Sequence, residues 1–185
     1  LKEKHFEVSL FYKDIFRIPT FNDLYYNLVG EPNLKPEKAK QYNLHTAYFT
    51  HLGEENYHNI YLGIDLYHNK VKDKIVAVPR NNLFIWSMVN YGQVTINGLE
   101  IKLNYTHERF INKENMKINL NLIYNYQQAV DSDKNSNTYL HQIQYTPRHS
   151  ANAIATISLK DYSLAYTLSA VGKRYTMNEN TDRNS

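Results

Sequence analysis

The residues best suited to metal chemistry are four oxygen-bearing side chains that alternate along one segment: Asp131, Asp133, Asn135 and Asn137. Carboxylate and amide oxygens at alternate positions begin the loop by which helix–loop–helix proteins bind Ca²⁺. That loop also requires a glycine where Ser136 stands and a bidentate glutamate where Gln142 stands. We therefore predict no metal site and interpret residues 131–142 as a solvated loop.

Enzyme signatures are missing from the chain. The sequence contains no Gly-x-Ser-x-Gly, His-Glu-x-x-His or phosphate-loop pattern, and its eight histidines are dispersed. It has no cysteine, which excludes a disulfide framework and thiolate metal sites. We predict a protein that is not an enzyme and that needs no cofactor.

A different chemistry is offered by arginines and aromatic residues that stand between strand-like runs. Aromatic rings provide flat apolar contact, and arginine binds anionic groups. For any one of these residues, packing within a loop or a place in an interfacial aromatic belt is the competing interpretation. The predicted ligand-binding residues are Arg17, Tyr25, Tyr26, Arg80, Phe84 and Trp86.

Composition narrows the class of protein. The 185 residues carry a net charge of +3, and lysine and arginine are scattered, which argues against nucleic-acid binding. Mean hydropathy is −0.61, and no run of about 18 apolar residues could form a membrane helix. Tyrosine dominates the aromatic residues, with 17 against 7 Phe and 1 Trp, and it suits membrane interfaces, binding surfaces and sheets.

Hydrophobic alternation predicts the secondary structure. From Met116 to Tyr126 apolar residues recur at every second position, with Ile123 as the one exception. Similar runs predict seven strands of about nine to twelve residues, the length that a tilted strand needs to cross a bilayer. These strands are 5–13, 39–50, 58–69, 90–105, 116–127, 148–159 and 162–172.

The connections between these strands alternate in length. Residues 14–38, 70–88 and 128–147 are long, with a local hairpin expected in the second between 75–78 and 83–86. The turns near 51–57, 107–114 and 160–161 are short. Long loops at one end and short turns at the other are typical of outer-membrane barrels. We therefore predict an all-β, antiparallel, up-and-down transmembrane β-barrel fragment.

Several segments resemble TonB-dependent outer-membrane receptors, in the order in which that family has them. The longest runs from Phe16 to Glu37 and is similar to the family's "fR-x-Pt…eLyy…gNPnLkPE" signature. Shorter ones follow at 38–44, 66–75, 90–100, 145–149 and 172–176. Glu31 departs from the pattern, since the family usually has Asn there, and the usual last strand ending in an aromatic residue is missing.

The resemblance implies that residues 1–185 are part of one β-barrel domain of the 22-stranded type. The plug domain and the final strands would then lie outside this chain. The resemblance also implies structural roles for eight signature positions: Pro19, Asn33, Pro36, Glu37, Gly98, Glu100, Pro147 and Arg148.

The function that the resemblance implies is import of a scarce, bulky nutrient across the outer membrane of a Gram-negative bacterium. The nutrient would be a ferric siderophore, haem or cobalamin. The expected partners are this small-molecule ligand, outer-membrane lipid or lipopolysaccharide, and a TonB-type energy-coupling protein acting through the plug. The alternatives are an outer-membrane barrel enzyme and a soluble β-sandwich module that binds carbohydrate or acts as an adhesin.

Overall fold

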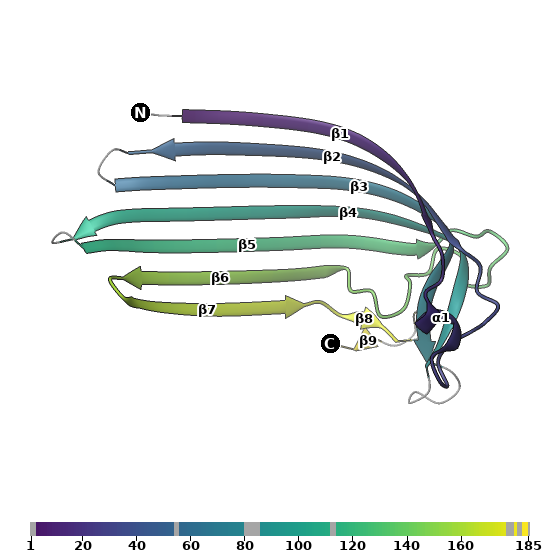
Figure 1. Cartoon of the computed structure of the whole chain (residues 1–185). Coiled ribbons are helices and arrows are strands. Elements are labelled where there is room, and N and C mark those ends of the chain that lie inside the picture. Colours follow the sequence, from purple (N-terminus) through teal and green to yellow (C-terminus); the bar gives the residue numbers. More distant parts are fainter. Residues whose placement is uncertain are drawn as a thin grey trace.

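A single antiparallel sheet of seven strands, in sequence order, makes up most of the protein (Figure 1). The computed structural model describes residues 3–53, 56–79, 86–111, 114–176, 180 and 183–184. The strands are β1 (Glu3–Arg17), β2 (Glu37–Leu52), β3 (Asn56–Pro79), β4 (Trp86–Ile111), β5 (Glu114–Asp131), β6 (His149–Leu159) and β7 (Tyr162–Val171). Strands that follow one another in the chain are neighbours in the sheet, so the predicted up-and-down topology is confirmed.

Most strands are longer than the predicted nine to twelve residues. β3 has 24 residues and β4 has 26, because both strands continue into the region predicted as a separate hairpin. Residues 75–78 pair with 87–90 rather than with the predicted 83–86, of which 83–85 lie outside the described residues. The β3–β4 ladder is interrupted where Asp73 (φ 52°) stands opposite Gly92. The register is the same on both sides, with Lys72 opposite Gln93 and Lys74 opposite Tyr91.

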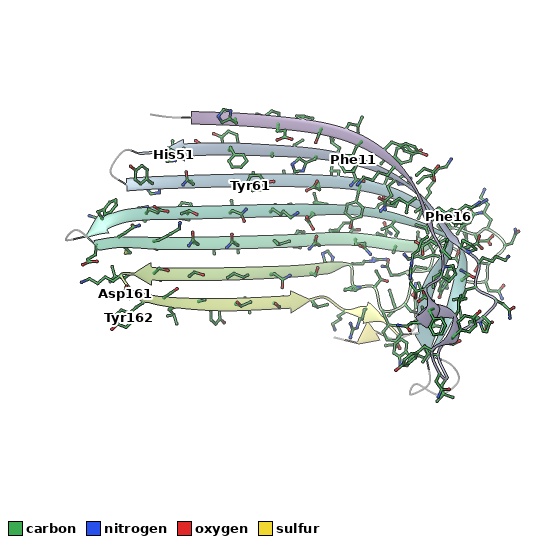
Figure 2. The ribbon with its side chains drawn as sticks, in the orientation of Figure 1. Phe11, Phe16, His51, Tyr61, Asp161 and Tyr162 are labelled. Atoms are coloured by element: carbon green, nitrogen blue, oxygen red, sulfur yellow. The ribbon has the colours of Figure 1, made fainter. Side chains whose placement is uncertain are left out.

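Long and short connections alternate as predicted, except that most of 70–88, predicted as a long connection, belongs to β3 and β4. Residues 18–36 and 132–148 are long and lie at one end of the sheet, which we call the loop end. β2, β4 and β6 end at the opposite end of the sheet, the turn end, and only short stretches of sequence separate each from the next strand (Figure 1). Figure 2 marks the turn end with Asp161 and Tyr162 of the β6–β7 hairpin, and Phe16 lies where β1 curves at the loop end.

The register gathers apolar side chains on one face of the sheet. Leu10, Leu44, Leu66, Leu99 and Tyr126 form one continuous row of directly paired residues across β1 to β5. Side chains on this apolar face are half-buried to exposed: Leu66 on a central strand is 46% exposed, and Leu10 and Leu164 on the edge strands are 78% and 73% exposed. Exposed leucines in continuous rows require an apolar surrounding rather than water.

Aromatic rings and histidines border the apolar face at both ends. Towards the loop end, Tyr42 lies between Tyr12 and His68, with ring centroids 5.1 and 6.2 Å apart. Towards the turn end, His58 stacks on His107 at 4.4 Å. His58 and His68 are ten residues apart on β3, or about 25 Å along the membrane normal for a strand tilted by about 40°.

The opposite face of the sheet is polar. His45 is paired with Asp65 at 2.7 Å, and Lys102 with Glu100. The ring of Tyr67 lies over its cross-strand partner Gly98, where an added Cβ would stand 1.9 Å from the ring. A polar face of this kind suits a crowded, wet lumen.

The remaining elements lie at the loop end: a helix α1 (Phe21–Tyr25) and a small pair, β8 (Arg174–Tyr175) and β9 (Arg183–Asn184). Within the described ranges, no helix has the length and apolar character needed to cross a membrane. β1 and β7 form the two outer edges of the sheet, and the backbone groups on their outer sides lack strand partners within the described part of the chain. Such edges are templates for further strands.

Candidate functional site

The loop between β1 and β2 is organised by α1. Thr20 caps this helix, since its hydroxyl accepts a hydrogen bond from the backbone N–H of Asp23, and the Asp23 carboxylate accepts one from the N–H of Thr20. This reciprocal pair is a capping box, which satisfies two N–H groups that a helix start otherwise leaves open. The backbone of Gly30 then closes the loop by donating to the carbonyl of Tyr26 at 2.7 Å.

Arg17, the last residue of β1, joins the helix to the sheet. Its guanidinium lies 3.0 Å from the Asp23 carboxylate and 3.6 Å from that of Glu37, the first residue of β2. Burial favours the neutral form of Asp23, but the hydrogen bonds from Thr20 and the charge of Arg17 outweigh it and lower the pKa of Asp23. Asp23 is therefore held ionised as the centre of this contact.

Asn90 is the centre of a second set of contacts, which fixes the outer end of the β3–β4 hairpin, residues 74–79 and 86–91. The side-chain oxygen of Asn90 accepts from the N–H of Lys35 at 2.7 Å, and its amide donates to the carbonyls of Lys35 and Asp73. The backbone N–H of Met88 donates to the carbonyl of Val29. The carboxylate of Glu37 accepts from the N–H of Ile75. The hairpin and the β1–β2 loop therefore form one connected layer at the loop end.

The β5–β6 loop completes this layer. Its backbone follows the end of β5, with the N–H of Ile143 donating to the carbonyl of Ala129. The side chain of Ile143 is buried, together with five sheet residues on the polar face: Ala39, Val71, Val94, Ile96 and Ala129. We call residues 18–36, 74–79, 86–91 and 132–148 the loop layer.

The loop layer presents an aromatic surface. The rings of Phe21 and Tyr25 lie 5.1 Å apart and are 75% and 58% exposed, and Tyr26 is 61% exposed. Leu28, in the left-handed conformation at φ 67°, adds an apolar side chain that is 79% exposed. A rigid helix that displays exposed rings can contact a large flat ligand.

The predicted ligand-binding residues take up different positions in this layer. Tyr25 ends α1 and Tyr26 follows it, whereas the guanidinium of Arg17 is engaged by the carboxylates of Asp23 and Glu37. Trp86 begins β4 and contacts Tyr145 of the β5–β6 loop, with ring centroids 5.0 Å apart. Arg80 and Phe84 lie outside the described residues.

The carboxylates of the alternating segment 131–137 form hydrogen bonds within the β5–β6 loop itself. The Asp131 carboxylate accepts from the N–H of Asp133 at 2.9 Å and from the hydroxyl of Thr138 at 2.7 Å. The Asp133 carboxylate accepts from the N–H of Asn135. Among the described residues, no group of three or more His, Cys, Asp or Glu side chains is placed to hold a metal ion.

The signature positions have structural contacts. Pro19 is buried, Pro36 is half-buried, and Asn33 donates twice to the carboxylate of Glu31, the residue at which the chain departs from the family pattern. Arg148 donates to Gln142, and its carbonyl accepts from Gln127, beside the half-buried Pro147. The contacts of Glu37, Gly98 and Glu100 are those described above.

Two central residues of the loop layer were not among the predicted site residues. Asp23 could have been found from the spacing Thr20-x-x-Asp23, which is a capping-box signature. Asn90 has no such local signal, because its partners Lys35 and Asp73 are 55 and 17 residues away.

Comparison with known proteins agrees with this architecture. The family model described as "TonB dependent receptor-like, beta-barrel" matches residues 5–185. A vitamin B12 transporter BtuB of Vibrio vulnificus is 34% identical over 88 residues, covering 47% of this chain and 13% of that protein. A second vitamin B12 transporter BtuB, from Photobacterium profundum, is 30% identical over 93 residues, covering 49% of this chain and 14% of that protein.

These matches span about one seventh of the relatives' length, so they concern one part of a large barrel. The relatives are transporters rather than enzymes. An exposed apolar face between two aromatic belts, with a polar face behind it, is the arrangement of a barrel wall in a membrane. This chain belongs to the TonB-dependent receptor-like β-barrel family and lies in the outer membrane.

Proposed function

We propose that this chain is part of the barrel of an outer-membrane receptor that binds cobalamin, or a closely related corrinoid, and imports it. Energy would come from a TonB-type coupling protein acting through a plug domain. The observation that carries the proposal is the loop layer, in which Arg17, Asn90 and Ile143 fix three separate segments into one structure at the mouth of the barrel. The similarity to two vitamin B12 transporters supports cobalamin over ferric siderophores and haem.

Cobalamin suits the chemistry of this surface. It is a large, flat, amphipathic ligand, and Tyr25 and Tyr26 offer exposed rings with hydroxyl groups at their edges. Trp86 packs against Tyr145, which joins the β3–β4 hairpin to the β5–β6 loop within the same layer. Pre-formed surfaces of this kind lower the entropy cost of binding. Arg17 contacts Asp23 of the helix that ends at Tyr25, and its direct contact with a ligand stays a prediction.

The test is binding of cyanocobalamin to the full-length receptor, compared with ferric siderophores and haemin. Tyr25→Ala combined with Tyr26→Ala should weaken cyanocobalamin binding by about ten- to a hundred-fold, because buried aromatic contacts contribute about 1–3 kcal/mol. Tyr162→Ala is the matched control, since Tyr162 is 80% exposed at the turn end.

Two outcomes would contradict the proposal. Equal loss in the Tyr162→Ala control would mean that the tyrosines act through folding. Tight binding of a ferric siderophore or haemin, with no binding of cyanocobalamin, would assign another nutrient. Growth of a cobalamin-requiring strain on limiting cyanocobalamin, with and without the receptor, tests import itself.

A further inference from the structure

Four lysines gather on the apolar-face side of the sheet, directly beyond the aromatic belt at the loop end. Lys40 lies two residues beyond Tyr42 on β2, and Lys70 lies two residues beyond His68 on β3. Because side chains two apart share a face, these lysines point to the same side as the belt. Lys38 and Lys72 follow one step further out. We call these four residues the lysine patch.

The strand register sets like charges against each other. Lys38 is directly paired with Lys72, and Lys40 with Lys70. Like charges directly opposite on neighbouring strands destabilise a sheet. All four lysines are exposed, and none forms an ion pair within the described part of the chain. Asp14, opposite Lys40, supplies one negative charge against four positive ones.

The patch surrounds a hollow rather than a flat surface. The hollow has a volume of about 550 Å³, and all four lysines line it together with Asp14. Gln93, Thr95 and Ser132 add neutral polar groups along its far side. Four ammonium groups with neighbouring amide and hydroxyl groups match the chemistry of an anion that carries several oxygens, such as a phosphate.

The position of the hollow decides which phosphate can reach it. It opens on the face that meets lipid, away from the lumen through which a nutrient would pass. It lies just outside the aromatic belt, at the depth where headgroups begin. A long lysine stem can lie along an apolar surface while its charged end reaches the headgroup layer.

We propose that the lysine patch binds the phosphate groups of outer-leaflet lipopolysaccharide. A polyanion in the hollow offsets the repulsion between the paired lysines, which one nearby carboxylate, that of Asp14, cannot neutralise. The inference rests on the outer-membrane location and is independent of which nutrient the receptor imports.

The experiment uses the full-length receptor, stripped of bound lipid in detergent. It compares binding of diphosphorylated lipid A, the same lipid without its phosphates, and inorganic phosphate. Each Lys→Gln substitution in the patch should weaken binding of the diphosphorylated lipid about five-fold. The quadruple variant should lose more than about a hundred-fold, and raised salt should reduce wild-type binding.

A matched control removes four exposed lysines elsewhere, by substituting Gln at Lys4, Lys13, Lys134 and Lys173. The control has the same net charge as the patch variant and should bind the diphosphorylated lipid nearly as well as the wild type. Heat-modifiable migration on a gel checks that both variants fold. If the quadruple variant fails that check, the single variants Lys40→Gln and Lys70→Gln provide the test.

Three results would overturn the proposal. The first is equal binding by the patch variant and the wild type. The second is equal binding of the lipid with and without phosphates, which would reduce the interaction to acyl-chain contact. The third is equally tight binding of inorganic phosphate, which would identify a general anion site rather than a lipid site. None of these results would alter the outcome of the cyanocobalamin assay.

Discussion

The guanidinium of Arg17 lies 3.0 Å from the carboxylate of Asp23, and this contact ties the end of β1 to the start of α1. Asp23 also completes the capping box with Thr20. One carboxylate therefore serves the helix and the strand together, and the exposed tyrosines of the loop layer depend on it.

Replacing Asp23 by Ala should loosen residues 18–31 without unfolding the barrel wall. The change removes a capping partner and one side of an ion pair, which together should cost about 1–3 kcal/mol of local stability. Hydrogen exchange of the full-length receptor measures the effect as faster exchange confined to this segment. Asp161→Ala, in the exposed β6–β7 turn, is the control and should leave the segment unchanged. Unaltered exchange in Asp23→Ala would show that the contact does not hold the loop.

The contact between Arg17 and Asp23 predicts that the local stability of the β1–β2 loop depends on pH. The pKa of Asp23 is lowered in the folded loop, so its ionised form stabilises the loop. For a lowered pKa, this stabilisation is fully present above the ordinary pKa of 3.8 and is lost as the pH falls through the lowered folded value. Hydrogen exchange of residues 20–31 should therefore rise steeply only in strongly acidic solution. Asp23→Asn should remove this acid-dependent step, and a step that persists in that variant would assign it to another group.

Asn90 should stabilise the outer end of the β3–β4 hairpin. In Asn90→Asp, the acceptor for the Lys35 N–H remains, but a carboxylate then faces the carbonyls of Lys35 and Asp73, to which the amide donates. We expect a local loss of about 1–3 kcal/mol, because two hydrogen bonds become repulsive contacts. Faster hydrogen exchange across 74–79 and 86–91 is the measurement. Asn104→Asp, at an exposed position on the polar face of the same strand, is a control outside the loop layer, and an equal effect there would point to a general response to charge.

Gly98 should tolerate no larger side chain while Tyr67 is present. A Cβ at this position would meet the Tyr67 ring, so Gly98→Ala must displace the ring and its hydrogen bond to Gln127. Overpacking of this kind costs about 1–3 kcal/mol. The thermal unfolding midpoint of Gly98→Ala should fall. The double variant with Tyr67→Ala should show less than the sum of the two single losses, and strict additivity would contradict the contact.

The alternation of apolar residues was enough to predict the strand order and the two faces, because a period of two fixes which side each residue faces. It underestimated the lengths of β3 and β4 at the loop end. Charged residues from Lys70 to Lys74 resemble a loop in composition, yet they continue the ladder almost without interruption.

The contacts that hold the loop layer together were harder to predict from the sequence. Proline and aromatic residues marked where the loops lie, but the residues that join them are far apart in the sequence. Lys35 and Asn90 meet across 55 residues, and no local pattern encodes such a contact. By contrast, the capping box of α1 is local, and its spacing could have predicted the helix.

The unchanged register on either side of Asp73 and Gly92 has a consequence for protein engineering. Equal numbers of residues lie on the two strands beyond this point, so the outer hairpin can be exchanged as a cassette between Lys72 and Gln93. A shorter or longer hairpin grafted there would leave every inner pair of β3 and β4 in place. The cassette must supply partners for Glu37 and Lys35, which now contact Ile75 and Asn90. In this way, receptors that share the same barrel wall could be given different outer hairpins at the loop end.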